Sequence, residues 1–230
     1  MKKLKKIAAK IAIIPARSGS RRIKDKNIKI FNKKPIIYWS IKAAKESKIF
    51  DRIIVSTDSK KIAKISNRYG AETPFIRKKK LAQDITSTVD VVRDAIKNSN
   101  IYNAKVCCIY PCAPLISPKD LIKAYKKLSK KVDFVFSSST FSSDIFNSFY
   151  FSNKNKKVLI NNKKLFYKGR KNKKIYHDAG QFYWGHKKSW VKKKEIFDSK
   201  VDIIEIPRWR SQDINHSDDW ETALKLSKII

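Results

Sequence analysis

A basic loop near the start of the chain holds most of the side chains that could do chemistry on a charged ligand. It follows residues 11–14, an uninterrupted apolar run of the kind found in buried parallel strands. Between Arg17 and Lys26 the loop carries arginine, lysine and serine side chains around Gly19, which lets backbone N–H groups approach a phosphate closely. Ligands of open α/β sheets bind beyond the carboxyl ends of such strands, so the loop predicts an anion site.

A purely structural turn is the alternative interpretation of this loop. Strands that end in basic, serine-containing turns are common, and the loop matches neither G-x-x-x-x-G-K-[ST] nor G-x-G-x-x-G, the fingerprints of P-loop and dinucleotide sites. The chain has only five glycines among 230 residues, well below the usual frequency. A glycine kept in the loop indicates a backbone requirement, which favours the ligand-binding interpretation.

The composition indicates a globular protein with a large excess of positive charge. Lysine and arginine number 54 against 20 acidic residues, a net charge of +34, which makes nucleic-acid binding an alternative function. The lysines are spread over nearly every segment, so no single nucleic-acid-binding stripe is indicated. No apolar run approaches the ~20 residues that cross a bilayer. The lysine-rich start lacks a signal-peptide core, and we expect a cytoplasmic protein without membrane insertion.

Alternating strand and helix patterns predict parallel βαβ units. Besides the first apolar run, strands are expected at residues 51–57, 71–76, 106–110 and 132–137. Helices are expected at 35–48, from Asp58 as N-cap to residue 68, at 87–98, and from Ser117 to residue 128. We therefore predict a single domain over residues 1–230, with three α/β/α layers around a mostly parallel sheet.

Residues 139–176 break this alternation. They are rich in aromatic residues, asparagine and lysine, and show strand-like pieces at 149–151 and 158–160 without a helical period. We interpret them as an antiparallel excursion from the sheet, with a mobile surface loop as the alternative. The chain then returns to the sheet at 179–184, forms a strand at 201–206, and ends in a helix that Ser217 caps.

Four motifs together resemble the CMP-nonulosonate cytidylyltransferases, which activate sialic acid and its relatives. The motifs are Pro15-Ala-Arg-Ser-Gly-Ser20 followed by Lys26-Asn27, then residues 50–58, residues 69–75 and Ser211-Gln-Asp-Ile214. They occur in the family's order and span nearly the whole chain. The resemblance implies Mg²⁺-dependent transfer of CMP from CTP to a nonulosonic acid with release of pyrophosphate. It also implies a homodimer formed through residues 139–176.

The resemblance implies roles for residues at matching positions. Arg17 would bind the α-phosphate and Lys26 the leaving pyrophosphate. The remaining nucleotide contacts would come from the loop residues Ser18, Gly19, Ser20 and Arg21, and, for cytosine and ribose, from Asn27, Arg77, Thr86 and Thr88.

Asp213 is the strongest metal candidate, because it follows a strand and precedes the acidic start of the last helix. In the family the segment typically reads Gln-Asp-Ile-Asp, and both aspartates hold Mg²⁺. Here Asn215 replaces the second one. Its carbonyl oxygen can still ligate a hard cation, but the lost charge should weaken metal affinity. Asp213, directly or through a metal-bound water, would help to remove the acceptor's hydroxyl proton.

Two segments resemble the pseudaminate branch of the family more than the sialic acid branch. They are residues 110–114 and 178–183, and they make Asp178, Gln181 and Tyr183 the candidate sugar-binding residues. We therefore expect pseudaminic acid as the acceptor. Sialic, legionaminic or a shorter keto-deoxy sugar acid is the alternative within the same chemistry, and Asn215 also keeps an inactive homologue in view.

Overall fold

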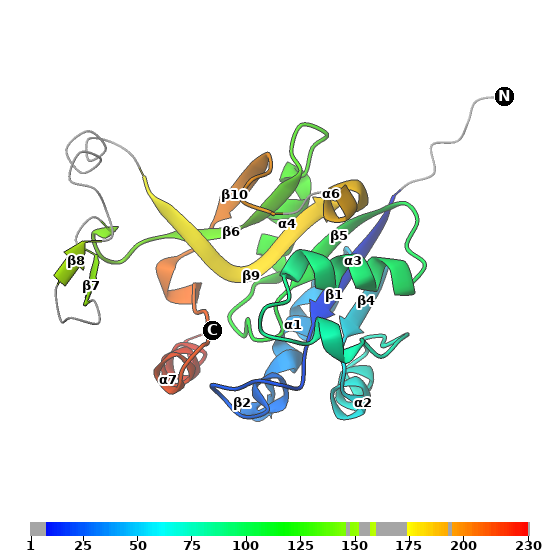
Figure 1. Ribbon diagram of the computed structural model, residues 1–230, viewed down its shortest axis with the longest axis horizontal. Coiled ribbons are helices and arrows are strands. Elements are labelled where there is room, and N and C mark those ends of the chain that lie inside the picture. The colour runs from blue at the N-terminus through cyan, green and yellow to red at the C-terminus, as the bar shows by residue number, and fades with distance from the viewer. Residues whose placement is uncertain (1–7, 146–147, 152–156, 160–173, 193–194, 230) are drawn as a thin grey trace.

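The computed structural model describes residues 8–145, 148–151, 157–159, 174–192 and 195–229. Within these residues a six-stranded sheet has the order β10-β6-β9-β5-β1-β4 (Figure 1). All neighbouring strands pair in parallel except β9, which runs antiparallel to β5 and β6. The strands are β1 (Ala9–Pro15), β4 (Arg52–Ser56), β5 (Ala104–Ile109), β6 (Phe134–Thr140), β9 (Tyr176–His186) and β10 (Val201–Glu205).

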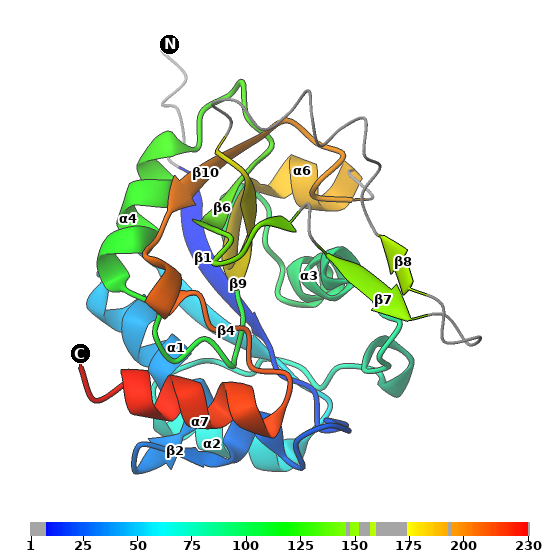
Figure 2. The ribbon, with the colours of Figure 1, turned by 90° about the vertical axis from the view of Figure 1, so that its left-hand side faces the viewer.

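Helices cover both faces of this sheet and complete the predicted three layers (Figure 2). One apolar cluster joins the sheet to α1 (Ile36–Glu46), α2 (Lys60–Arg68) and α4 (Pro118–Lys127). A second cluster on the opposite face joins it to α3 (Thr88–Asn98) and α6 (Lys187–Lys192). The fold class predicted from the sequence is therefore confirmed.

The strand β1 is apolar without alternation because both of its faces are buried. Ala12 and Ile14 pack into the cluster with α1 and α4, whereas Ile11 and Ile13 pack into the cluster with α3. All four are at most 2% exposed. Each isoleucine buried in this way contributes about 1.5–3 kcal/mol of hydrophobic stabilisation. This burial fixes β1 in the sheet and, with it, the starting point of the basic loop.

A third apolar cluster joins the segment after the basic loop to the C-terminal helix α7 (Ser217–Leu226). Phe31 and Trp220 pack edge to face with ring centroids 5.4 Å apart, and Ile23 and Ile214 are buried beside them. Phe31 belongs to a small hairpin of β2 (Ile30–Phe31) and β3 (Lys34–Pro35), whose turn places Asn32 and Lys33 at positive φ. The cluster holds the basic loop and the Asp213 segment against each other.

The strand predicted at residues 71–76 does not form. Glu72 and Ile76 make only isolated parallel bridges, to Ile54 of β4 and to Thr57 just after it. Pro74 lies between them and lacks the N–H that a continuous ladder requires.

Two predicted helix caps are also wrong. Ser59, and not Asp58, caps α2, because its hydroxyl accepts the N–H of Ile62. His216 is the N-cap residue of α7, and Ser217 is already helical. The carboxylate of Asp219 there accepts the backbone N–H groups of Asn215 and His216. Because Asp58 does not cap the helix, its carboxylate can accept hydrogen bonds from another segment of the chain.

The predicted antiparallel excursion contains a hairpin of β7 (Phe149–Phe151) and β8 (Lys157–Leu159). Figure 1 shows it apart from the main sheet, beyond the bend in the long strand β9. Residues 146–147, 152–156 and 160–173 of the excursion lie outside the described residues. Dimerisation through this region stays a prediction.

None of the helices in the described ranges has the length and apolar character needed to cross a bilayer.

The buried ion pair between Arg210 and Asp120 links the segment before Asp213 to the first turn of α4. Their side chains are 15% and 7% exposed. Arg210→Met leaves the Asp120 carboxylate without its counter-charge, so we expect the free energy of unfolding to fall by about 3 kcal/mol. Urea titration measures this change. Glu46→Gln, which removes an exposed pair with Lys42, should change it by less than about 0.5 kcal/mol, and equal effects would contradict the prediction.

Candidate active site

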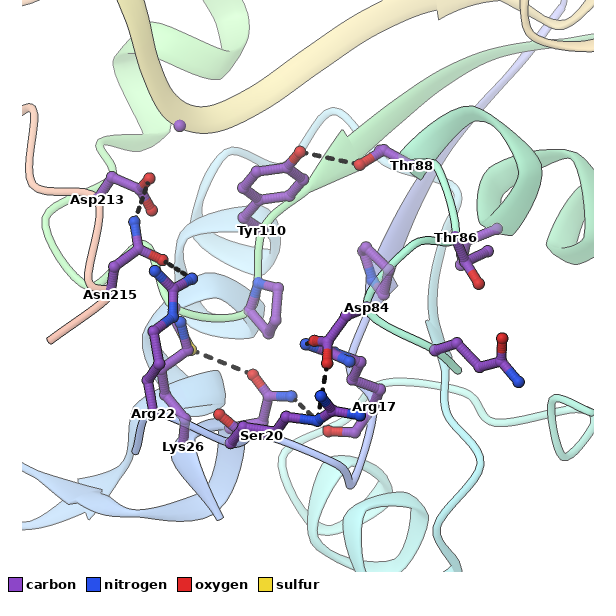
Figure 3. Close-up of a pocket in the computed structure, with 18 of the residues that line it drawn as sticks. Arg17, Ser20, Arg22, Lys26, Asp84, Thr86, Thr88, Tyr110, Asp213 and Asn215 are labelled. Atoms are coloured by element: carbon purple, nitrogen blue, oxygen red, sulfur yellow. Dashed lines mark hydrogen bonds and ion pairs between the residues drawn. The ribbon is translucent and has the colours of Figure 1, made fainter. Parts of the chain in front are cut away.

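A cavity of about 630 Å³ opens beyond the carboxyl ends of β1 and β5 (Figure 3). The basic loop forms one side of it, the segment from Arg77 to Thr88 a second, and the segment around Asp213 a third. Of the predicted site residues, those that line the cavity are Arg17, Ser20, Arg21, Lys26, Asn27, Arg77, Thr86, Thr88, Asp213 and Asn215. The fold thus brings together residues that are spread over almost the whole chain.

Two of the three arginines of the loop share a carboxylate that the sequence did not indicate. Arg17 forms an ion pair and hydrogen bond with Asp84, and the Nε of Arg21 lies 3.0 Å from the other oxygen of the same carboxylate. The hydrogen bond from Arg17 lowers the pKa of Asp84. The carboxylate of Asp84 therefore lies where the sequence predicts a bound phosphate. Asp84 could have been suspected only as a lone acid in a basic loop segment.

Ser18 directs its donors away from the cavity and toward Asp58. The Asp58 carboxylate accepts the backbone N–H of Ser18 at 2.8 Å and its hydroxyl at 2.6 Å. Burial acts to raise the pKa of Asp58, but these hydrogen bonds hold it below its ordinary value. Because β1 and β4 are parallel neighbours, the residues that follow them meet, and Asp58 anchors the start of the basic loop. Ser18 and Gly19 are not among the residues that line the cavity.

Asn27 is held behind the loop by both ends of its amide. Its Nδ2 donates to the carbonyl oxygen of Arg17 at 2.8 Å, and its Oδ1 accepts the thiol of Cys112 at 3.1 Å. Burial raises the pKa of Cys112 to about 12, so the thiol stays a donor. Asn27 therefore ties the loop to the end of β5, whether or not it also contacts a base.

Arg77 is a buried cation in the cavity wall. It is 3% exposed, and its Nε has no hydrogen-bond partner among the described residues. Burial lowers the pKa of Arg77, and the nearby carboxylates of Asp58 and Asp94 counter this shift. Such a group gains most from an anionic or carbonyl oxygen of a ligand. Thr88 beside it shares a 2.9 Å hydrogen bond with the hydroxyl of Tyr110.

The opposite side of the cavity is a bridge of polar side chains around Asp213. The amide of Asn215 donates from Nδ2 to Asp213 and accepts at Oδ1 from Arg22, both at 2.7 Å (Figure 3). Lys26 donates to the carbonyl oxygen of Ile214 at 2.5 Å. The basic loop and the Asp213 segment are thus joined directly. No cluster of three or more His, Cys, Asp or Glu side chains suited to a metal occurs within the described ranges.

The three candidate sugar-binding residues lie behind the cavity wall. Asp178 accepts the N–H of Gly180 at 3.0 Å and the hydroxyl of Tyr183, and its pKa is raised by burial. Gln181 is 1% exposed and donates to the carbonyl oxygen of Arg210 at 2.6 Å. The hydrogen bonds of these three residues are to other parts of the protein, and a direct contact with sugar stays a prediction.

Gly180 is the β9 residue that lines the cavity. Its φ is +62°, and a Cβ there would lie 3.4 Å from the Cβ and Cγ of Asp213. A side chain at this position would therefore be strained by the positive φ, although its Cβ would make only an ordinary van der Waals contact with Asp213.

Asp84 should compete with a bound triphosphate for Arg17 and Arg21. We expect Asp84→Asn to tighten binding of CTP, the nucleotide implied by the sequence resemblance, by about threefold to fivefold, the scale of an exposed ion pair. Calorimetric titration with CTP measures the dissociation constant. Glu72→Gln removes the same charge at a pair with Arg52, outside the cavity-lining set, and should leave it unchanged. Weaker CTP binding in the Asp84 variant would contradict the competition.

Comparison with known proteins agrees with this geometry. The chain is 37% identical over 224 residues to the pseudaminic acid cytidylyltransferase of Campylobacter jejuni, which covers 95% of this chain and 96% of that protein. It is 33% identical over 215 residues to a Helicobacter pylori protein named pseudaminic acid cytidylyltransferase and UDP-2,4-diacetamido-2,4,6-trideoxy-beta-L-altropyranose hydrolase, covering 90% of this chain and 40% of that protein.

A solved structure of CMP:2-keto-3-deoxy-manno-octonic acid synthetase complexed with CTP has the same fold. The TM-score is 0.73 at 12% sequence identity, over 96% of this chain and 99% of that one. The model of one family, described as cytidylyltransferase, matches residues 11–229. With a match over nearly its whole length, the chain belongs to the cytidylyltransferase family.

Proposed function

We propose that this protein transfers CMP from CTP to the anomeric hydroxyl of pseudaminic acid and releases pyrophosphate. The observation that carries the proposal is one cavity in which the basic loop, Arg77 and Asp213 face a common space, in a chain 37% identical to a pseudaminic acid cytidylyltransferase over 95% of its length. In the reaction, the acceptor oxygen bonds to the α-phosphorus and the bond between that phosphorus and the pyrophosphate oxygen breaks.

The basic loop supplies the charge that this step requires. Arg17 and Arg21 exchange the Asp84 carboxylate for triphosphate oxygens, to which a guanidinium donates two parallel hydrogen bonds. Lys26 stabilises the departing pyrophosphate from its position against Ile214. The exchange breaks the ion pairs with Asp84, so the cost of losing them offsets part of the gain from the triphosphate.

The far side of the cavity takes the nucleoside. Arg77 donates to a carbonyl or phosphate oxygen and thereby gains a partner for its Nε, which has none in the described part of the chain. Thr86 and Thr88 line the same side, where they offer hydroxyls to ribose or base. The anchored amide of Asn27 holds the loop beneath them.

The residues around Asp213 fit a Mg²⁺ ion that is shared with the substrate. Mg²⁺ is commonly held by one or two carboxylates together with substrate phosphates and waters, so Asp213 suffices as the protein's charged ligand. Asn215 can add its Oδ1 if Arg22 turns to the phosphates. When bound, the ion neutralises phosphate charge. Asp213 accepts the proton of the acceptor hydroxyl, directly or through a water.

We also propose that the protein is a homodimer joined through residues 139–176. The hairpin of β7 and β8 has only two strands and lies away from the main sheet (Figure 1). Such hairpins are marginally stable alone, and their open edges favour pairing with another chain.

Pyrophosphate release from CTP and Mg²⁺ tests the proposed reaction. Pseudaminic, legionaminic and sialic acids are compared with a reaction that lacks an acceptor. Release with pseudaminic acid alone supports both the proposed reaction and the proposed acceptor. Release with another sugar acid supports the reaction but shows that the acceptor is a different one. No release from any acceptor by a protein that binds CTP would favour the inactive-homologue alternative.

Arg17→Ala should lower kcat/KM for CTP about 100-fold or more, because the variant loses a charged donor to the reacting phosphate. The midpoint of thermal unfolding should change little, since the Arg17 side chain is 31% exposed and pairs only with Asp84 among the described residues. Steady-state pyrophosphate assays measure the effect. Wild-type turnover in this variant would remove Arg17 from the phosphate site.

Asn215→Asp should raise Mg²⁺ affinity about tenfold, because a second carboxylate adds a charged oxygen ligand beside Asp213. Without Mg²⁺ the same variant should unfold at a lower temperature, since two carboxylates would face each other where an amide now donates. Calorimetry with Mg²⁺ in the presence of CTP measures the affinity. Asn215→Ala, which removes the bridge without adding charge, should show no such rise; a rise there would point away from charge as the cause.

A further inference from the structure

Tyr110 lies in the wall of the cavity and is held there from three directions. Its backbone N–H donates to the carbonyl oxygen of Gln181 at 2.8 Å, and its own carbonyl oxygen accepts the hydroxyl of Ser40 at 2.7 Å. Its phenolic hydroxyl shares the 2.9 Å hydrogen bond with Thr88. A side chain fixed at both the backbone and the tip has little freedom to move, so its ring is a preformed part of the site.

The Tyr110 ring lies in the cavity wall between the Thr88 side and the Asp213 side. Figure 3 shows it between Thr88 on one side and Asp213 with Asn215 on the other. The ring also packs against Tyr183, with centroids 5.4 Å apart. Through Gln181 the backbone of Tyr110 is tied to the residue next to Gly180, which itself lies against Asp213. The position of the ring is therefore coupled to the side of the cavity where the acceptor enters.

The ring offers the acceptor an apolar surface. Burial raises the pKa of the Tyr110 hydroxyl to about 12, so the hydroxyl stays protonated, and Thr88 already satisfies it. A polar substituent pressed against the ring would lose its water without gaining a partner. A methyl group or a deoxygenated carbon would be favoured at the same place.

We propose that Tyr110 is a specificity-determining residue for the acceptor. Its ring receives an apolar substituent of the sugar acid, such as the methyl of an acylamino group, and so aligns the anomeric hydroxyl with the α-phosphate. This inference rests on the proposed function, because it assumes that a sugar acid occupies the Asp213 side of the cavity. The neighbouring polar groups of Asn215 and Arg22 remain for the carboxylate and hydroxyls of the same acceptor.

Methionine and glutamine provide a matched pair for the test, because they have similar length and differ in polarity. We expect Tyr110→Gln to lower kcat/KM for the acceptor by about 10- to 100-fold, the range for loss of one apolar contact in a specificity pocket. Tyr110→Met should lower it much less, and Tyr110→Phe, which keeps the ring, should stay within about threefold of wild type. The KM for CTP should change by less than about threefold in all three.

The experiment first identifies the acceptor that the wild-type protein uses, and then measures the three variants with that acceptor. This order keeps the two proposals apart, since a wild-type protein that prefers another sugar acid alters the proposed function and still permits the Tyr110 comparison. Thermal unfolding and CTP titration of each variant show whether the fold and the nucleotide site are intact. If glutamine fails to fold, Tyr110→His supplies the polar substitution.

Two results would overturn the role of Tyr110. Equal acceptor kcat/KM in the methionine and glutamine variants would show that polarity at this position does not matter. A loss that appears in the KM for CTP, and not in the acceptor parameters, would place the ring against the nucleoside. A selective loss of acceptor kcat/KM in the glutamine variant supports the inference.

Discussion

The parallel pairing of β1 with β4 on one side and β5 on the other is the constraint on which the site depends. The pairs Ile14 with Val55 and Ile13 with Cys108 place the three strands in register, so the residues that follow them emerge at one edge of the sheet. That edge receives the basic loop, Asp58 and Tyr110. Hydrophobic burial on both faces of β1 supplies the free energy that keeps this edge in place. Every contact described at the cavity relies on that arrangement.

Charge is the second organising feature of the molecule. The chain has a net charge of +34 and only 20 acidic residues, yet Asp84, Asp58 and Asp213 lie at the cavity or directly behind its loop. Asp84 pairs with two arginines, Asp58 orders the loop and lies near the buried Arg77, and Asp213 stays exposed beside an amide. Each acid has a different surrounding and therefore a different task. In the proposed reaction, a polyanionic substrate replaces Asp84 at the arginines, leaves Asp58 in place and contacts the Asp213 side of the cavity.

The C-terminal segment closes the site from a distance in sequence. Arg22 and Asn215 are 193 positions apart, and Lys26 and Ile214 are 188 apart, yet both pairs are hydrogen bonded. The packing of Phe31 on Trp220 and the buried pair of Arg210 with Asp120 hold that segment from both ends. The basic loop and the position of Asp213 are therefore mechanically connected, because Arg22 and Lys26 of the loop donate to the residues beside Asp213.

The sequence by itself determined the layers of the fold and the place of the basic loop at the end of the first strand. Continuous apolar runs, helix-start residues and a glycine in a basic loop are local signals, and apart from the strand at 71–76 the main-sheet strands and the helices that they predicted lie within a few residues of the observed ones. The sequence did not determine which hydrogen-bond or ion-pair partner each polar residue has. Asp58 satisfied the local rule for a helix cap but binds Ser18, and residues 71–76 looked like a strand although Pro74 interrupts the ladder. The pairing of Asp84 with Arg17 and the position of Tyr110 in the cavity wall arise where separate segments meet. Only the tertiary structure decides such contacts, because they depend on competition among distant groups for the same donors and acceptors.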